Sequence, residues 1–277
     1  MRTIWVTGDQ LDRHLGALGE VEPGEARVLL VESEAILSRP RHVQRNHFVI
    51  TAMRRFAKDL RSAGFEVDHR RSASLEAGLA EHIVDHQPDD IVATEPNSRA
   101  ARGLCERLEI TTVRSDQFLC HADDFRAWAD GRSTLRLEDF YRWNRKRLGY
   151  LMDGDAPVEG RWNFDQDNRE PPPQDPSIFS GPPRSKLDEL DAEVLDSLPE
   201  TFGQPPVGYW ATSRRAALTR LRHFLDHELE RFGPYEDAMT SRSWSLAHSM
   251  LSPYLNLGLL RPAEVCDAVE ARYRDGR

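Results

Sequence analysis

The sequence contains little cysteine and no long apolar run. Its 277 residues include three cysteines, Cys105, Cys120 and Cys266, and no two of them form a Cys-x-x-Cys pair. Neither a disulfide framework nor a local zinc site is therefore indicated. No segment approaches the ~20 apolar residues that cross a bilayer, and the N-terminal MRTIWVTGDQ lacks the apolar region of a signal peptide. We therefore expect a cytoplasmic protein without membrane-spanning segments.

Several motifs that carry chemistry are also missing. The sequence contains no Gly-x-Gly-x-x-Gly fingerprint and no Walker A motif, so a phosphate cradle at a strand end is not indicated. It contains no Gly-x-Ser-x-Gly elbow, and no serine or cysteine is marked as a nucleophile by its surroundings. We therefore do not expect hydrolysis, and we assign no catalytic residue.

The net charge of -9 argues against nucleic-acid binding by the chain as a whole. One segment is nevertheless basic. Residues 132–147 carry six arginines and lysines, with Phe140, Tyr141 and Trp143 interleaved among them. Such a segment could face a polyanion. It is also typical of an amphipathic helix with buried aromatic and solvated basic side chains, and the sequence alone favours this second interpretation.

The first part of the chain alternates short apolar runs with helical patterns. The apolar positions of Val43–Ser62 recur at helical spacing, and Gly64 follows where a C-cap belongs. Strand, helix, strand, helix is the pattern of a parallel sheet with crossover helices, so we expect a doubly wound, Rossmann-like α/β domain over residues 1–127. The predicted strands are Ile4–Thr7, Val28–Val31, Phe65–Val67, Ile91–Ala93 and Thr111–Val113, and the further helices are Leu75–His86 and Arg99–Leu108.

Carboxylates and amides follow these predicted strands. They lie in Gly8–Leu11, Glu32–Glu34, Thr94–Asn97 and Ser115–Gln117. Ligands of doubly wound domains bind outside the carboxyl ends of the strands. Carboxylates and amides suit hydroxyl and ring N–H groups, so the rim favours a polyol or heterocycle over a nucleotide. Each residue taken singly also fits an ordinary cap or turn.

Proline marks the middle of the chain. Ten of the 17 prolines lie between Pro157 and Pro206, a density that excludes long helices and central strands. We expect a connector and linker over residues 128–210, with one short helix within Ser185–Asp196. A helical pattern returns from Ala211, and a further helix is predicted over Pro262–Arg274.

Two histidine pairs have helical spacing. His82 and His86 are four residues apart, as are His223 and His227. Two such histidines can bind one metal ion, but neither pair carries the glutamate of the zinc protease motif, and the sequence reveals no third ligand. The pattern favours surface or capping roles, and we assign no metal ligand.

The segment HSMLSPYLNLGLL, residues 248–260, contains a helix start at Ser252-Pro253. Serine suits the N-cap, and proline suits the first helical position. A cap needs one side-chain hydroxyl, which Ser252 supplies, so Ser249 and His248 are additional polar groups beside the helix start. The free N–H groups of a helix start can bind an anion. The physical pattern leaves both interpretations open and favours the cap.

Five stretches taken together resemble a known family. They are Met1–Leu11, Arg45–Gly64, Phe118–Gly131, Arg136–Pro173 with its YLMDGDAPVEGRWNFDQDNREPPP, and residues 248–260. In this order they resemble the prokaryotic iron–sulfur branch of the cryptochrome/photolyase family, often called deoxyribodipyrimidine photolyase-related proteins. The resemblance implies an α/β antenna domain over residues 1–127, a linker over 128–210, and residues 211–277 as the opening helices of an all-α FAD domain.

The resemblance also implies cofactors and the residues that contact them. The implied cofactors are FAD and a 6,7-dimethyl-8-ribityllumazine antenna, whose ribityl chain agrees with the polyol expectation. The candidates for the antenna pocket are Asp9, Gln10, Glu32, Glu34 and Glu95. The candidates for the edge of the FAD site are Tyr235, His248, Ser249, Leu251 and Ser252.

The implied activity of the full-length parent is light-driven repair of pyrimidine (6-4) lesions in DNA, by electron transfer from reduced FAD. DNA would be the partner, contacted through residues 132–147. The family also holds a 4Fe-4S cluster, but the three cysteines here are not positioned as its ligands. Family chains continue well beyond position 277, so we expect a fragment, a truncated product or half of a split protein, inactive alone. The alternatives are a sensory cryptochrome without repair activity, a stand-alone chromophore-binding or nucleotide-binding α/β protein, and an inactive remnant.

Overall fold

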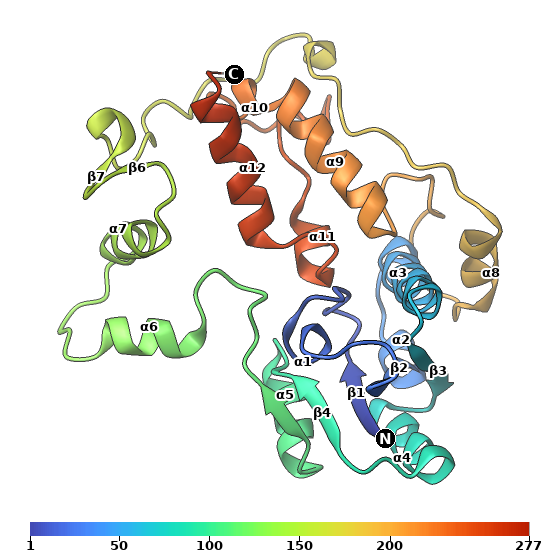
Figure 1. Ribbon diagram of the computed structural model, residues 1–277. Helices are drawn as coiled ribbons and strands as arrows, with labels where there is room; N and C mark the ends of the chain where they lie inside the picture. Colours follow the sequence, from blue (N-terminus) through green and yellow to red (C-terminus); the bar gives the residue numbers. More distant parts are fainter. Residues whose placement is uncertain (277) are drawn as a thin grey trace. The chain divides into compact units, whose positions relative to one another are not determined.

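The computed structural model describes residues 1–276 and contains the predicted parallel sheet (Figure 1). Its five strands are all parallel and lie in the order β3-β2-β1-β4-β5. The doubly wound α/β fold expected from the sequence is therefore confirmed. The strands are β1 (Arg2–Val6), β2 (Ala26–Ser33), β3 (Glu66–Ser72), β4 (Ile91–Thr94) and β5 (Thr111–Val113).

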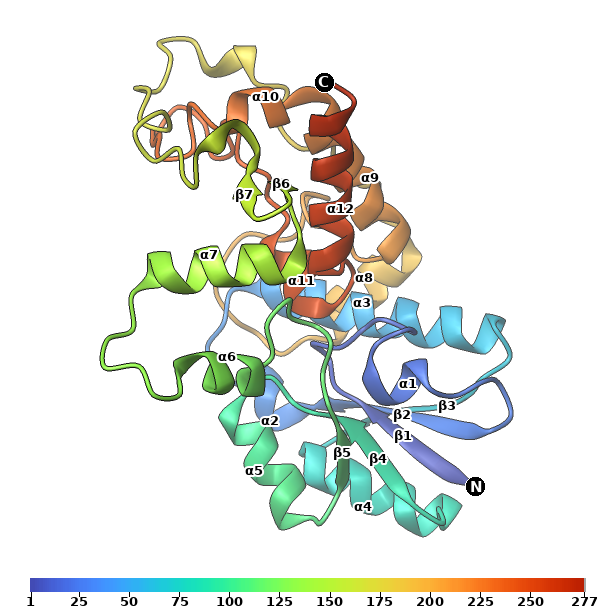
Figure 2. The same cartoon turned by 60° about the vertical axis from the view of Figure 1, so that its left-hand side comes forward.

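Helices cover both faces of the sheet (Figure 2). On one face, Trp5, Leu29 and Val31 form a buried cluster with Leu79 and Cys105. Residues that alternate with these along the strands point to the other face, where two further helices contact the sheet. The helices of the first face are α4 (Leu75–His86) and α5 (Arg99–Arg107), and those of the second are α1 (Gly16–Gly19) and α3 (Val43–Ser62).

Local signals begin and end these helices. The side chain of Ser74 caps α4 by accepting from Ala77 N–H, and Ser98 caps α5 in the same way. Gly64 follows α3 with a φ of +92°, in the left-handed region that glycine adopts at little cost. The predicted bounds of α3 and α4 are confirmed because these signals lie within the chain segments themselves.

The chain divides into two compact units. The first comprises Met1–Gln117, Arg184–Leu218 and Pro253–Leu260, and the second comprises Phe118–Pro183, Thr219–Ser252 and the described residues 261–276. The first unit contains the sheet, its helices, α2 (Glu34–Leu37) and α8 (Glu189–Ser197). The boundaries at residues 127 and 210 that the sequence suggests stay a prediction of domain organisation.

The second unit is mainly helical. Its helices are α6 (Ala122–Ala129), α7 (Leu137–Leu148), α10 (Leu229–Phe232) and α12 (Pro262–Arg274), with short 3-10 turns at Val158–Gly160 and Pro176–Ile178. A two-stranded antiparallel ribbon joins β6 (Met152–Asp153) to β7 (Ala156–Pro157). Two helices, α9 (Arg214–His227) and α11 (Ser252–Leu257), each contain a boundary between the units. Among residues 1–276, none of the helices combines the length and apolar character that crossing a membrane requires.

Candidate functional site

A hydrogen-bonded cluster lies where β1 and β4 end. Asn97 Nδ2 donates to Asp9 Oδ2 at 3.1 Å and to Gln117 Oε1 at 2.8 Å. Gln117 Nε2 donates to the carbonyl of Asp9 at 2.7 Å, and Gln10 Nε2 donates to the carbonyl of Glu95 at 3.0 Å. The cluster therefore joins the loops that follow β1, β4 and β5.

The strand order explains why these residues meet. The chain runs outward from β1 to β2 and β3, then returns to β4 and β5 on the other side of β1. The point between β1 and β4 is therefore the topological switch point, where ligands of doubly wound sheets bind. Gln10 and Gln117 are buried, whereas Asp9 and Asn97 are partly exposed. Buried amides hold the loops, and the partly exposed carboxylate and amide can meet a ligand.

Glu32 and Glu34 lie on the other side of β1 and have different partners. Glu32 lies inside β2, which is longer than predicted, and its side chain is 4% exposed. Its carboxylate pairs with Arg54 Nε at 2.8 Å and with His69 Nε2 at 3.0 Å. Glu34 begins α2 and pairs with Arg71 at 3.3 Å. The structure thus brings Asp9, Gln10 and the backbone of Glu95 together, and it places the two other glutamates in separate ion pairs.

The pKa of Glu32 reflects this ion pairing. Burial alone would raise the pKa of this carboxyl group, but hydrogen bonds from His69 and Arg54 lower it to about 2. Glu32 is therefore charged at neutral pH and neutralised by neighbours on β3 and α3. This ion pairing links β2 to β3 and to α3, which is a structural role.

In the second unit, His248 and Ser249 line a small hollow together with Glu228. Glu228 is 3% exposed, and its Oε1 accepts from the backbone N–H of Ser180 at 2.7 Å and from the Ser180 hydroxyl at 2.6 Å. Its Oε2 is buried and has no hydrogen-bond partner among the described residues. Buried acceptors normally receive a hydrogen bond, so Oε2 is expected to accept one from water or from a ligand hydroxyl.

The same hollow has a volume of about 10 Å³, which is roughly the space of one water molecule. His223 also lines it, and burial and the neighbouring His227 lower the pKa of its imidazole. The described residues that line the hollow therefore leave room for one small hydrogen-bonding group. They do not enclose a ring system of the size of a flavin.

The remaining candidates of the FAD edge lie near this hollow in sequence. Tyr235 packs edge-on against Phe179, with ring centroids 5.4 Å apart. Leu251 is 3% exposed, and Ser252 is exposed at the first residue of α11. A helix start at Ser252-Pro253 is therefore confirmed, but one residue earlier than predicted: Ser252 is the first helical residue, not the N-cap, and α11 is only six residues long.

The basic-aromatic segment 132–147 forms α7 and the loop before it. Phe140 and Trp143 pack against Phe125 and Trp128 of α6, with centroid separations of 5.1 to 6.1 Å between Trp128, Phe140 and Trp143. Cationic side chains lie over a further ring, Trp162. These are Arg142 at 5.4 Å, Arg145 at 5.7 Å and Lys146 at 5.6 Å from its centroid. The amphipathic interpretation expected buried aromatic side chains, but none of the α7 residues is buried: Phe140 and Trp143 are half-buried and Tyr141 is exposed. Three of the basic side chains lie over an aromatic ring instead of being solvated only.

The cysteines are separated in the structure. Cys105 is buried in the core beside the sheet, whereas Cys120 and Cys266 belong to the second unit. None of the three forms a disulfide among the described residues, and burial raises the pKa of Cys105 and Cys266. Their environments are those of packed thiols.

The fold defines a doubly wound α/β unit, with a polar cluster at its strand ends, accompanied by a mainly helical unit. The family model of deoxyribodipyrimidine photo-lyase-related proteins matches residues 4–210. A (6-4) photolyase of Agrobacterium fabrum (strain C58) is 36% identical over 290 aligned positions, which cover 99% of this chain and 57% of the relative. The chain therefore belongs to the deoxyribodipyrimidine photo-lyase-related family, and the resemblance read from the sequence is confirmed.

Solved photolyase structures match as well. The crystal structure of a bacterial class III photolyase from Agrobacterium tumefaciens matches with a TM-score of 0.57 and 17% identity, over 99% of this chain and 56% of that one. An archaeal photolyase from Sulfolobus tokodaii, crystallised with two FAD molecules, matches with a TM-score of 0.45 and 15% identity, over 100% of this chain and 58% of that one. The chain thus spans little more than half the length of the relatives it matches.

Two partners in the strand-end cluster were not among the residues selected from the sequence. Asn97 and Gln117 follow predicted strands, but the sequence does not reveal which polar residues after a strand turn toward one another. The order of the strands in the sheet supplies that information. The strand-end rule had identified the loops that follow β4 and β5, but not which of their side chains meet.

Proposed function

We propose that the first unit binds an antenna chromophore, 6,7-dimethyl-8-ribityllumazine, at the switch point between β1 and β4. The observation that carries this proposal is the cluster that joins Asp9, Asn97 and Gln117 across the ends of three strands. Membership in the photolyase-related family supports it further. When bound, the lumazine would supply absorption of near-ultraviolet light.

The residues present fit such a ligand. The Asp9 carboxylate can accept hydrogen bonds from ribityl hydroxyls, and the Asn97 amide oxygen can accept a further one, since both of its N–H groups donate within the cluster. Gln10 and Gln117, held by backbone carbonyls, keep these two groups in place. The set of polar groups is small and convergent, as is usual in small-molecule sites. We propose Asp9, Gln10 and Glu95 as antenna-site residues on this basis, together with Asn97.

Titration of the purified full chain with the lumazine, followed by fluorescence, tests this site. Asn97→Leu removes hydrogen bonds worth about 1.5 kcal/mol and should weaken binding about tenfold. Glu34→Gln is the matched control, because Glu34 is the antenna candidate that pairs with Arg71 on the β2 side. Equal affinity of Asn97→Leu and the parent chain would refute a site at the switch point, and a loss confined to Glu34→Gln would move it to the β2 side.

We further propose that Tyr235, His248, Ser249, Leu251 and Ser252 belong to the edge of an FAD site. The buried, unpartnered Oε2 of Glu228 supports this, since it requires a donor and Glu228 lines the same hollow as His248 and Ser249. FAD would supply light-driven electron transfer when bound. The described residues would hold one edge of it, so we assign them no step of the photochemistry. Stoichiometric FAD absorbance of the purified chain would contradict their assignment as an edge only.

For the whole protein we propose light-driven repair of pyrimidine (6-4) lesions in DNA. The (6-4) photolyase that shares 36% identity supports this proposal. DNA contact through residues 132–147 is part of it, since α7 carries exposed basic side chains beside aromatic rings. A sensory role without repair is the alternative, and a repair assay on the full-length protein with a (6-4) lesion substrate distinguishes the two.

A further inference from the structure

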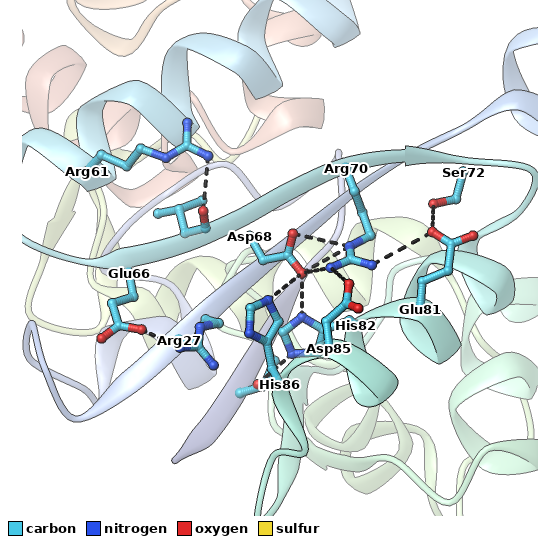
Figure 3. A network of polar contacts seen from close by, with 12 residues as sticks. Arg27, Arg61, Glu66, Asp68, Arg70, Ser72, Glu81, His82, Asp85 and His86 are labelled. Carbon is cyan, nitrogen blue, oxygen red and sulfur yellow. Dashed lines mark hydrogen bonds and ion pairs between the residues drawn. The ribbon is translucent and has the colours of Figure 1, made fainter.

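Three potential metal ligands converge in the first unit, away from the strand-end cluster. Asp68 lies on β3, and His82 and His86 lie on the last turns of α4 (Figure 3). Asp68 Oδ2 is 2.6 Å from His82 Nδ1 and 3.4 Å from His86 Nε2. These three ligand atoms all lie within 4.8 Å of one another.

The local fold explains this convergence. Histidines four residues apart lie on the same face of a helix, and the two imidazole centroids are 4.8 Å apart. The short connection between β3 and α4 turns the helix back onto the strand it follows. Asp68 thereby reaches the histidine pair from 14 residues earlier in the chain. The third ligand that the sequence does not reveal is therefore present in the fold.

We propose that Asp68, His82 and His86 bind one divalent transition metal ion of the zinc class. Two imidazoles and one carboxylate, with a fourth position open to water, form a common donor set for Zn²⁺. With metal–ligand bonds of about 2.0 Å, tetrahedral ligands lie about 3.3 Å apart. The Asp68–His86 separation already has this value, and the Asp68–His82 separation must widen by about 0.7 Å as the metal replaces the shared proton.

The groups around the ligands suit a metal site. His82 is fully buried, and its Nε2 lies 2.8 Å from the Thr3 hydroxyl. With a metal on Nδ1, the Nε2–H group donates to Thr3, which is the outer hydrogen bond typical of ligating histidines. Burial lowers the pKa of the His82 imidazole, and the neighbouring Asp68 opposes this shift.

Arg70 orients the carboxylate. Its Nε donates to Asp68 Oδ1 at 3.1 Å and to Oδ2 at 2.9 Å, and its Nη2 also donates to Oδ2. The guanidinium must therefore shift onto Oδ1 when Oδ2 binds the metal. Arg70 also pairs with Asp85 at 3.2 Å and lies 3.8 Å from Glu81. Three carboxylates around one guanidinium leave two negative charges, which a divalent cation neutralises. The C-terminal end of α4 adds its own partial negative charge.

Zinc titration of the chelator-treated full chain, by calorimetry and by competition with a chromophoric chelator, tests the proposal. One equivalent of Zn²⁺ should bind. His86→Ala should lower the affinity at least about tenfold, since even outer partners of ligands matter that much. The His86 side chain is 30% exposed and ends a helix, so this variant should fold, which circular dichroism verifies. Thr3→Val should weaken zinc about 10-fold to 100-fold through the outer hydrogen bond.

His227→Ala is the matched control. His223 and His227 have the same helical spacing, and their centroids are 4.7 Å apart. Among the described residues, they are not joined to a third ligand. The control should bind zinc as the parent does, and zinc should raise the melting temperature of both proteins but not that of His86→Ala. Equal zinc affinity of His86→Ala and the parent, or no binding at stoichiometric zinc, would overturn the proposal and leave an ion-pair network around Asp68.

Discussion

Replacing Glu32 with glutamine should destabilise the first unit by about 3 kcal/mol at neutral pH. Glutamine keeps the shape of the protonated acid but removes the charge that faces Arg54 and His69. A lowering of the pKa from 4.5 to about 2 corresponds to about 3 kcal/mol of stability. The loss of one partner of a buried ion pair is typically of this size.

The effect should depend on pH in a defined direction. Because the folded-state pKa of Glu32 is lowered, its contribution is fully present above the unfolded-state pKa of about 4.5. It is lost as the pH falls from about 4.5 toward about 2. The difference between the parent and Glu32→Gln should therefore shrink from about 3 kcal/mol at pH 7 to about 1.5 kcal/mol near pH 3.

Urea denaturation of the full chain, followed by far-ultraviolet circular dichroism at several pH values, measures this difference. Glu34→Gln is the control, because the Glu34 side chain is 56% exposed and its pair with Arg71 should contribute less than about 1 kcal/mol. If Glu32→Gln is as stable as Glu34→Gln at pH 7, or if its deficit does not change with pH, the ion-pair reasoning is refuted.

Two further predictions concern packing and DNA contact. Gly78→Ala should destabilise the chain by about 1 kcal/mol in urea denaturation, although alanine favours helices, because its Cβ would lie 2.5 Å from Val31 Cγ1. Gly103→Ala, which meets no atom within 4 Å, should be neutral or stabilising, and the same sign for both variants would contradict the packing argument. Lys146→Glu should weaken binding of labelled DNA in fluorescence anisotropy and lower the salt slope by about one, whereas Lys186→Glu should not. Equal losses in the two lysine variants would indicate a general charge effect.

Sequence periodicity predicted much of the fold because the relevant forces are local. The bounds of Val43–Ser62, Leu75–His86 and Pro262–Arg274 agree with α3, α4 and α12. Their ends are marked by residues such as Ser74 and Gly64, whose effects act within a few residues. The extra length of β2 and β3 was not predicted. Charged residues such as Glu32 and Arg70 look unsuited to strands until their ion-pair partners are known.

The sequence could also identify polar strand ends as candidate sites, but it could not tell which of them lie at the switch point. Asp9 and Glu32 each follow or end an apolar run, and nothing in either run distinguishes them. Strand order places Asp9 at the switch point and Glu32 one strand away, beside Arg54 and His69. The sorting depends on pairing between segments that are distant in the chain.

By itself, the sequence determined the alternation of strands and helices in the first unit, the limits of three helices (α3, α4 and α12) and the family, because these depend on periodicity, caps and extended matching stretches. The tertiary structure alone decided which polar side chains share a neighbourhood. It joined Asn97 and Gln117 to Asp9, and it brought Asp68 to the histidine pair of α4. These contacts depend on strand order and on the packing of a helix against the strand that precedes it. Neither can be deduced from a single segment of the sequence.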